Sequence, residues 1–420
     1  QGHRDRKPMA MLGLQHRRAL SLALAILASL LGLWHIGSNQ AFSALGRPLR
    51  CSSPPSAPAA FANSASFSPS SVLASRGSAC LVFGAVIALA ARALIMQNKG
   101  GGHGEIGYHL ALNLKKRGID VTMINDSSAK QSSPPFDSYG ELQSAGVTVI
   151  WSDLSDAAGP RAVLNQVPAC DFVFDNQNIC PKDVQQMVKP WNPKVYAYVS
   201  SGGMYIPVDG PLLETGAVKE DNKQLSIERN AAANGLNWCA FRPQYIYGPK
   251  TNKRDYLDWF FDRILAEVEF PLPGNGSFRT TVTNAEDVAG MLAAVVDKPE
   301  AAVGQVFNCA NDQMISHLEI VEHIAEAVGK SPTEVKQKIV FYDPGSLKGK
   351  ELPKKGKFPF RENTFGVGVE KAKSALTWSP QHYLLGDIKE YYNEYVRLGK
   401  NTQPLANEWD QAVIAIARGA

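Results

Sequence analysis

The chain has 420 residues, of which 45% are apolar and 20% are charged. This length and composition are typical of a globular protein with two to three units, and they exclude a collagenous, wholly disordered or polytopic membrane protein. Residues 1–98 hold nine basic residues and one acidic residue, which leaves 34 basic and 38 acidic residues in the rest. The formal charge of +4 is therefore no argument that the folded part binds nucleic acid.

Residues 1–41 have the pattern of a secretory signal peptide. His16, Arg17 and Arg18 precede an apolar run at residues 19–34, and small or polar residues follow it. The run is shorter than the roughly 20 apolar residues that span a membrane, so we expect no stable membrane span in the mature protein. A signal anchor is the alternative interpretation.

Residues 42–90 have the composition of a plastid transit peptide. Residues 42–78 contain eleven Ser, three Arg and no acidic residue, a composition that cannot form a core. A signal peptide followed by a transit peptide predicts import into the stroma of a complex plastid, which is wrapped in additional membranes. A disordered secreted linker is the alternative, and the role of the apolar stretch 79–91 stays open.

Residues 91–250 predict an α/β fold with a Rossmann-like, doubly wound parallel sheet. An apolar strand at 93–97 precedes a glycine-rich turn at 101–107, a helix at 108–117 and a second strand at 121–125. Strand, glycine-rich turn, helix and strand in this order are typical of a dinucleotide-binding unit. Further strands are expected at residues 147–151, 172–175, 195–200 and 238–241.

The glycine-rich turn makes NAD(P) a candidate cofactor. Glycines let the backbone approach a pyrophosphate, and the helix N-terminus supplies N–H groups. The second strand places Asn125, followed by Asp126, where an acid usually holds the adenosine ribose, so NAD(P) binding stays open. The predicted cofactor-site residues are Gly101, Gly102, Gly104, Ile106, Gly107, Asn125 and Asp126.

Residues 251–400 predict a smaller C-terminal α/β lobe, followed by a tail at 401–420. Amphipathic helical patterns cover residues 256–268, 316–328 and 384–398. Ser316 and Glu319 form a capping-box pattern at the start of the second helix. The third helix is rich in tyrosine; we expect these helices to pack in the lobe, and the third is also a candidate self-association face.

Several motifs resemble the NAD-dependent epimerase/dehydratase type of the extended short-chain dehydrogenase/reductase superfamily. Their order along residues 93–399 is the order in that superfamily. The motifs are GGHGEIG (101–107), SSGGMY (200–205), RPQYIYGP (242–249), EDVA (286–289), FN (307–308) and WSP (378–380).

The resemblance implies catalysis by a tyrosine base, a lysine four residues later, and a Ser or Thr that polarises the substrate oxygen. Ser201 occupies the serine position, but residues 206–241 contain no tyrosine. Glu220 and Gln224 stand where the tyrosine and the lysine belong, and neither can perform that proton transfer. We therefore do not expect oxidoreductase or epimerase activity.

A finer set of motifs is similar to the chloroplast stem-loop-binding protein branch of this superfamily. The set includes FVFDNQN (172–178), FRPQYIYG (241–248), DWFFDR (258–263), FPLPGNG (270–276) and FYDP (341–344). The resemblance implies a plastid protein that binds stem-loop transcripts and ribosomal RNA, with divalent-metal-dependent endoribonuclease activity. It also implies self-association or membership of plastid ribonucleoprotein and ribosome complexes.

Acidic and amide side chains at strand ends make Mg²⁺ a second candidate cofactor. Asp175 and Asn176 end one strand beside the glycine-rich turn, and Asp153 follows another. Carboxylates from such strand ends are suitable magnesium ligands. We predict Asp175, Asn176 and Ser201 as catalytic residues and Asp175 and Asp153 as metal ligands. Helix capping or solvation of these side chains is the alternative.

One basic cluster in the body is a candidate RNA-binding strip. Phe358 and Phe360 interleave with it and would stack on bases. A solvated loop is the alternative, and Lys250, Lys253 and Arg254 form a second candidate. The predicted RNA-binding residues are Lys348, Lys350, Lys354, Lys355, Lys357 and Arg361.

Three hypotheses of function stay open. The first is a plastid RNA-binding protein, with or without metal-dependent endoribonuclease activity. The second is an NAD(P)-dependent nucleotide-sugar epimerase or dehydratase, which the missing tyrosine and lysine disfavour. The third is a non-catalytic scaffold on plastid complexes.

Overall fold

The computed structural model describes residues 90–97 and 103–419. Residues 1–89, which hold the predicted signal peptide and transit peptide, lie outside the described residues, as do Gly101 and Gly102. Within the described ranges, no helix is both long enough and apolar enough to cross a membrane.

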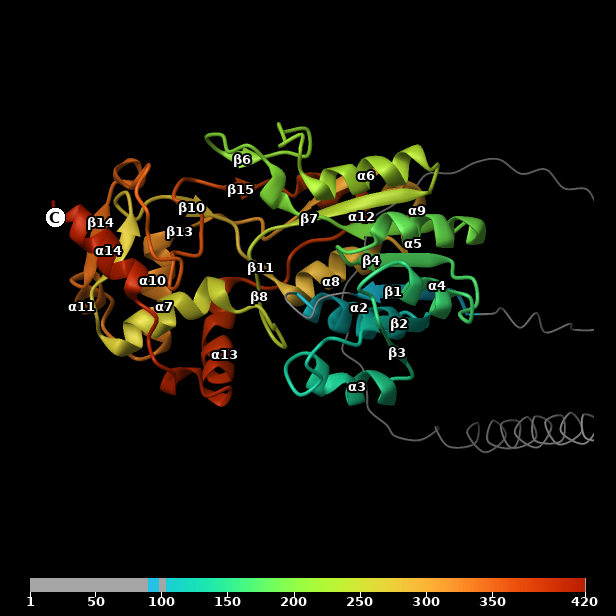
Figure 1. The fold of residues 1–420 in the computed structure, drawn as a ribbon, viewed down its shortest axis with the longest axis horizontal. Helices are drawn as coiled ribbons and strands as arrows, with labels where there is room; N and C mark the ends of the chain where they lie inside the picture. The colour runs from blue at the N-terminus through green and yellow to red at the C-terminus, as the bar shows by residue number, and fades with distance from the viewer. Residues whose placement is uncertain (1–89, 98–102, 420) are drawn as a thin grey trace, which may run out of the picture. The chain divides into compact units, whose positions relative to one another are not determined.

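The largest element is a seven-stranded parallel sheet with the strand order β12-β7-β5-β4-β1-β2-β3 (Figure 1). This order runs outward in both directions from β1 and β4, which confirms the predicted doubly wound α/β fold. The strands are β1 (Arg92–Gln97), β2 (Asp120–Asp126), β3 (Thr148–Ser152), β4 (Phe172–Asn176), β5 (Val195–Val199), β7 (Trp238–Pro243) and β12 (Gln305–Cys309).

Helices cover both faces of the sheet, because successive strand residues point to opposite sides (Figure 1). Ala93 and Ile95 of β1 pack in one core with α2 (Glu105–Lys116), α3 (Tyr139–Ser144), α8 (Ala285–Ala294) and α12 (Glu370–Leu376). Leu94 and Met96 pack in the other core with α4 (Ala158–Leu164), α5 (Pro181–Val188) and α6 (Lys223–Ala233). Because the side chains of this apolar strand alternate in direction, it contributes to two cores, one on each face of the sheet.

The second lobe is mainly helical and has an aromatic core. Two parallel strands, β9 (Phe270–Pro273) and β14 (Ile339–Tyr342), pair within it. The side chains of Ser316 and Glu319 form the predicted capping box. The helices are α7 (Asp255–Ala266), α10 (His317–Ala327), α11 (Pro332–Lys336), α13 (Leu384–Arg397) and α14 (Glu408–Ala417).

Tyr391 and Tyr395 of α13 are buried against Phe261 rather than presented on a surface. Short strand pairs join neighbouring segments around the two lobes. They are β6 (Pro211–Leu212) with β15 (Gly366–Val367), β8 (Ile246–Tyr247) with β11 (Thr283–Asn284), and β10 (Arg279–Thr280) with β13 (Ile315–Ser316).

The lobes do not divide at residue 250 as a linear reading of the sequence predicts. α8, β12 and α12 all follow residue 251, yet they pack on the large sheet. The predicted tail at 401–420 instead contains α14, whose Trp409 is buried in the second lobe. The chain therefore crosses between the lobes several times, and the crossing segments border the site described below.

Candidate functional site

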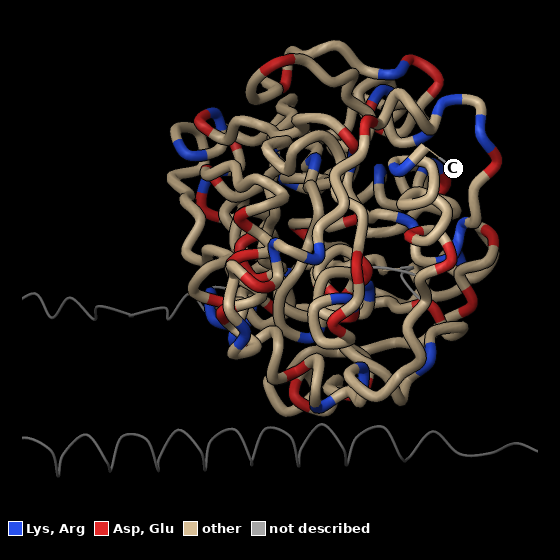
Figure 2. The backbone as a smooth tube through the Cα atoms, turned by 90° about the vertical axis from the view of Figure 1, so that its left-hand side faces the viewer, with Lys and Arg blue, Asp and Glu red and all other residues tan. Residues whose placement is uncertain are grey.

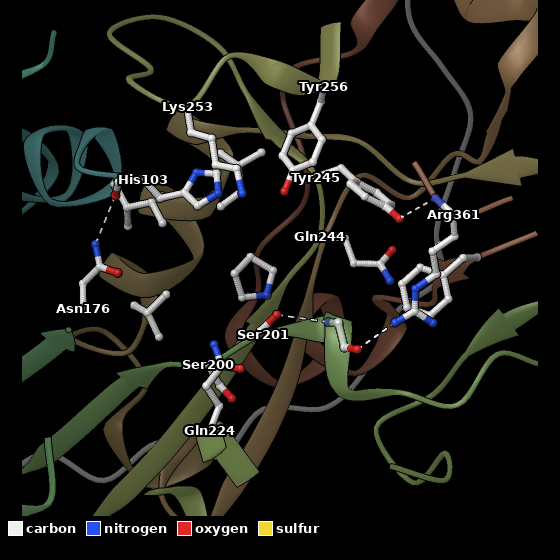
Figure 3. Close-up of a pocket in the computed structure, with 16 residues that line it drawn as sticks. His103, Asn176, Ser200, Ser201, Gln224, Gln244, Tyr245, Lys253, Tyr256 and Arg361 are labelled. Atoms are coloured by element: carbon white, nitrogen blue, oxygen red, sulfur yellow. Dashed lines mark hydrogen bonds between the residues drawn. The ribbon is translucent and has the colours of Figure 1, made fainter. Parts of the chain in front are cut away.

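A cavity of about 250 Å³ lies at the carboxyl ends of β4, β5 and β7, facing the second lobe (Figure 3). Open sheets of this kind bind ligands at such a position, where the strand order reverses. We call this cavity the central cleft. It is lined by His103, Ile106, Asn176, Val199, Ser200, Ser201, Gly203, Gln224, Pro243, Gln244, Tyr245, Ile246, Lys253, Tyr256, Arg361 and Phe365.

The central cleft carries positive charge. Its lining includes Lys253 and Arg361 and contains no Asp or Glu. Among the described residues, no ion pair involves either cation. Arg361 instead donates to the carbonyl oxygens of Gly203 (2.7 Å) and Tyr205 (3.3 Å). Its guanidinium carbon lies 3.6 Å from the centre of the Phe365 ring, which fixes a cation at the cleft wall.

Tyr245 lines the cleft in an unusual backbone conformation. Its φ is +35°, a region that bulky residues seldom adopt and that costs about 1–3 kcal/mol. Its ring makes edge contacts with Tyr256 and Phe360, and its hydroxyl accepts a hydrogen bond from the Arg361 backbone N–H at 3.1 Å. These contacts hold the strained residue in place. Burial raises the pKa of Tyr245 to about 12.

Ser201 faces the cleft as the sequence predicts, whereas Ser200 turns into the protein. The Ser201 hydroxyl accepts a hydrogen bond from Gly203 N at 3.1 Å. Ser200 Oγ donates to Glu228 at 2.6 Å, and Glu228 forms a buried ion pair with Arg242. This network braces the strand ends beneath Ser201.

Tyr205 does not replace the missing catalytic tyrosine. It is fully buried, its hydroxyl donates to Asn308 Oδ1 (2.7 Å) and it accepts from Arg242 (2.9 Å). Burial raises its pKa to about 12. Gln224 does line the cleft at the lysine position, but Glu220 is exposed and pairs with Arg229. The cleft therefore lacks the Tyr–Lys arrangement on which hydride-transfer chemistry in this fold depends.

The N-terminus of α2, where a dinucleotide pyrophosphate would bind, is occupied by the protein's own carboxylate. Glu105 is 0% exposed and accepts a hydrogen bond from Thr251 Oγ1 at 2.9 Å. Burial would raise its pKa, but His103, the Glu105 backbone N–H and Thr251 hold the pKa below its ordinary value. Asn252 Oδ1 also accepts a hydrogen bond from the Gly104 backbone N–H at 3.0 Å. A buried anion at this point repels a pyrophosphate.

The adenosine side of the expected cofactor site is filled as well. Asn125 is fully buried and its Oδ1 accepts from Gln97 Nε2 at 3.0 Å and from Tyr139 OH at 3.3 Å. Asp126 Oδ1 accepts the Ser128 N–H at 2.9 Å, and the Phe136 ring lies against Gly104. We call this set the closed corner. Its members are Gln97, Glu105, Asn125, Phe136 and Tyr139.

The predicted cofactor-site glycines follow the same pattern. A Cβ on Gly107 would lie 1.9 Å from Gln97 Oε1, so Gly107 serves the close approach of a side chain. Ile106 is buried in the core and lines the central cleft. The described residues at this position do not fit NAD(P).

The predicted metal ligands do not fit a shared Mg²⁺ ion either. Asp175 is 0% exposed, and its two oxygens accept from Tyr196 OH (2.5 Å) and Gln177 N (3.2 Å). Asp153 is exposed and its Oδ1 accepts the Ser155 N–H at 2.9 Å, which lowers its pKa. β1 and β2 separate β3 from β4, which places the two strand ends roughly 14 Å apart. In the described part of the chain, no three His, Cys, Asp or Glu side chains could hold a metal.

The predicted basic strip is divided among different environments. Phe358 and Phe360 are buried in the second lobe, so the prediction that they stack on RNA bases is wrong. Lys355 pairs with Glu408 at 3.0 Å, and Arg361 lies in the central cleft. Figure 2 shows basic and acidic segments interspersed over the face of this lobe.

A second cavity of about 620 Å³ adjoins the central cleft and shares Tyr245, Lys253 and Tyr256 with it. We call it the lysine groove. Its lining includes Lys354 and Lys357 of the predicted strip, whereas Lys348 and Lys350 line neither cavity. The groove is lined by Tyr245, Lys253, Asp255, Tyr256, Asp258, Trp259, Asp262, Arg263, Lys354, Gly356, Lys357, Pro359, Lys400, Gln403, Pro404 and Ala406.

The acidic residues of the groove are mostly engaged elsewhere. Asp258 accepts from Arg254 and Tyr391 and lies 4.0 Å from the groove residue Lys400, and Asp262 accepts from Tyr395 at 2.7 Å. Of the second basic candidate, only Lys253 faces the cavities. Lys250 pairs with Glu141, and Arg254 is buried beside Asp258.

The chain is similar to a named plant protein along most of its folded part. It is 30% identical over 302 residues to the chloroplast stem-loop binding protein of 41 kDa b from Arabidopsis thaliana. The aligned region covers 70% of this chain and 77% of that protein. This chain belongs to the chloroplast stem-loop binding protein branch of the epimerase/dehydratase family. The family model for the NAD dependent epimerase/dehydratase family matches residues 222–310.

Solved structures of sugar-nucleotide enzymes share the fold. The dTDP-glucose 4,6-dehydratase of Bacillus anthracis aligns with a TM-score of 0.58 and 15% identity, over 74% of this chain and 98% of that one. The UDP-glucuronic acid 4-epimerase of Bacillus cereus aligns with a TM-score of 0.56 and 18% identity, over 73% of this chain and 99% of that one. Both were solved with NAD, but identities this low show the fold alone.

Sequence analysis missed Gln244, Tyr245 and Tyr256 as residues of the cleft. The first two stand inside the RPQYIYGP motif, so the motif itself was a usable signal. Tyr256 lies eight residues past Gly248 in a pattern that reads only as an amphipathic helix. Its exposure to the cleft depends on how α7 docks beside the sheet.

Proposed function

We propose that this chain is a plastid RNA-binding protein that holds RNA along the lysine groove and the central cleft. The observation that carries the proposal is the continuity of the two cavities around Lys253 and Tyr256, with unpaired cations on both sides. Phosphate backbones bind such lysines and arginines, and bases stack on such rings. The stem-loop binding function in the name of the Arabidopsis relative supports the same conclusion.

Plastid location is part of the proposal. Its supports are the chloroplast relative and the leader composition of residues 1–89. Import into the stroma of a complex plastid, self-association and membership of ribonucleoprotein complexes extend it. Metal-dependent strand cleavage stays a prediction from the resemblance, because among the described residues no three His, Cys, Asp or Glu side chains are grouped to hold a metal.

A direct test measures RNA binding and enzyme turnover with the same preparation. We expect salt-sensitive binding to stem-loop RNA and no turnover of nucleotide sugars with added NAD or NADP, because the cleft lacks the Tyr–Lys pair. Turnover that Ser201→Ala abolishes would favour the epimerase alternative. Failure of the chain to bind RNA at 50 mM salt would refute the proposal.

A further inference from the structure

We propose that the central cleft takes one unpaired nucleotide of an RNA loop, with its base on Tyr256 and its phosphate beside Arg361. This inference rests on the proposed RNA-binding function. It adds the chemical class of the group that enters the cleft, which is a single nucleoside monophosphate unit.

The size of the cleft limits the ligand. Its volume of about 250 Å³ is below the range of roughly 300–1,000 Å³ that is usual for pockets holding larger organic ligands. A paired duplex cannot enter it, and a dinucleotide would also need the closed corner. One nucleotide turned out of an RNA loop matches the available space.

Two buried amide side chains line the cleft, and in each of them one polar atom has no hydrogen-bond partner among the described residues. Asn176 is 2% exposed and Gln244 is 4% exposed, yet Asn176 Oδ1 and Gln244 Nε2 have no hydrogen-bond partner among the described residues. An unmade buried hydrogen bond is costly, so a ligand that supplies it gains affinity.

The orientation of both amides is fixed by their other ends. Asn176 Nδ2 donates to His103 O at 3.2 Å, and Gln244 Oε1 accepts from Thr281 Oγ1 at 2.5 Å. The wall of the cleft therefore holds one unpartnered acceptor and one unpartnered donor, each in a side chain whose other end is fixed. Figure 3 shows both amides at the cleft. The edge of a nucleobase carries donors and acceptors that complement such a pair.

Aromatic rings supply a surface on which a base can stack. The rings of His103 and Tyr256 are nearly parallel, with 11° between their planes and 6.5 Å between their centres. Figure 3 shows both rings along one wall of the cleft, with Lys253 beside them. Tyr245 stands almost perpendicular to Tyr256, at 81°, and closes the end of this wall.

The cations mark the path of the strand. Arg361 is positioned by two backbone carbonyl groups, and no ion pair of the described residues involves it. Lys253 borders both cavities, so a strand that leaves the cleft enters the lysine groove. The loop nucleotide thus lies in the cleft, and its flanking backbone follows Lys354 and Lys357.

The experiment measures the affinity of the full chain for three labelled RNAs by fluorescence anisotropy. They are a hairpin, the same hairpin with abasic loop positions, and a blunt duplex of the stem alone. We expect the hairpin to bind about 5- to 150-fold more tightly than the abasic hairpin, the range expected for stacking of one base. Tyr256→Ala should abolish this preference, and Tyr256→Phe should retain it.

Tyr383→Ala is the matched control, because Tyr383 is exposed and lines neither cavity. It should leave the preference unchanged. Thermal unfolding of each variant confirms that the protein remains folded. Crosslinking of a hairpin with 4-thiouridine in its loop should label a peptide that contains Gln244 or Tyr256.

The outcomes separate this inference from the function on which it rests. If no RNA binds, the proposed function fails. If RNA binds but the three RNAs bind equally, or Tyr256→Ala keeps the preference, RNA binding stands and the inference about the cleft is overturned. Competition by free nucleoside monophosphates shows whether the cleft binds a nucleotide of RNA or a free nucleotide. If they bind in a Tyr256-dependent way and do not displace the hairpin, the cleft is a site for a free nucleotide, and the RNA assignment is overturned.

Discussion

The closed corner and the central cleft lie at the same edge of one sheet but differ in how their polar groups are satisfied. In the closed corner, Gln97, Asn125 and Tyr139 bond to one another, and Glu105 Oε1 is bonded to Thr251 and His103, which leaves Glu105 Oε2 as the one member atom without a partner among the described residues. In the central cleft, Asn176 Oδ1 and Gln244 Nε2 have no partner among the described residues. At this edge of the sheet, the closed corner is therefore filled by side chains, whereas the central cleft is open.

The difference shows that the fold of a dinucleotide-binding unit does not by itself provide a site whose described residues fit the cofactor. The glycine-rich turn and the parallel sheet satisfy the pattern of a dinucleotide-binding unit. A carboxylate at the start of α2 and a ring over Gly104 are enough to oppose a pyrophosphate and an adenosine. The open cleft, and not the fold, therefore indicates what this chain binds.

The largest expected effect separates the two regions by stability. Phe136 is 4% exposed and packs on Gly104 and on Trp151, so Phe136→Ala should lower the free energy of unfolding by about 3–5 kcal/mol. RNA affinity, measured where the variant is folded, should be unchanged. Tyr256→Ala should show the reverse pattern, since Tyr256 is only half-buried. Urea unfolding and anisotropy titration of both variants check this.

A result in which Phe136→Ala weakens RNA binding as strongly as Tyr256→Ala would contradict the separation. It would mean that the closed corner contributes to the RNA site. Phe136→Leu serves as the milder control, because it keeps most of the apolar volume and should lose less stability.

A smaller effect distinguishes lysines inside the groove from lysines outside it. Changing Lys253, Lys354, Lys357 and Lys400 to Gln should flatten the dependence of log K on log salt by roughly 2–3 units, about 0.7 for each phosphate contact on a single strand. Changing Lys348 and Lys350 to Gln should leave the slope nearly unchanged. The two sets differ in position rather than in kind of charge.

The measurement is a titration of stem-loop RNA at several salt concentrations. The first set changes four lysines and the second set two, so the flattening is compared per lysine changed. Equal flattening per lysine would show that RNA responds to the positive charge of this lobe as a whole and not to the position of each lysine. That outcome would restore the basic strip as a single surface, which the pairing of Lys355 with Glu408 argues against.

Sequence predicted the elements whose signals are local. The apolar strand β1, the helix that follows it and the capping box of Ser316 and Glu319 each depend on a few neighbouring residues, so their structure follows from local pattern alone. The sequence also shows that position 220 holds a glutamate where the resemblance expects the catalytic tyrosine. These features required no knowledge of distant partners.

The side-chain environments depend on partners far away in sequence. Asp175 is buried because Tyr196 on the neighbouring strand donates to it, and Glu105 is buried because Thr251 reaches it from 146 residues away. Phe358 reads as an interleaved surface ring but packs against Trp259 and Phe260. Periodicity does not encode such contacts, so the predicted metal site and stacking strip were wrong in their geometry.

The smallest expected effect concerns the charge of Glu105. Its pKa in the folded protein is lowered, so its ionised form stabilises the fold above the ordinary value of 4.5, and this contribution is lost as the pH falls through the lower folded value. Glu105→Gln should cost about 1–2 kcal/mol at pH 7, because it removes a hydrogen-bonded charge. The difference from the unaltered protein should shrink below pH 4.5. Urea unfolding at pH 7, 5, 4 and 3.5 measures it, with the exposed Glu220→Gln as control. A difference that stays constant across this range would mean that Glu105 is not ionised in the folded protein. The electrostatic argument against a pyrophosphate at the N-terminus of α2 would then be wrong. Only the steric argument, from the side chains that fill the space around Asn125 and Phe136, would remain.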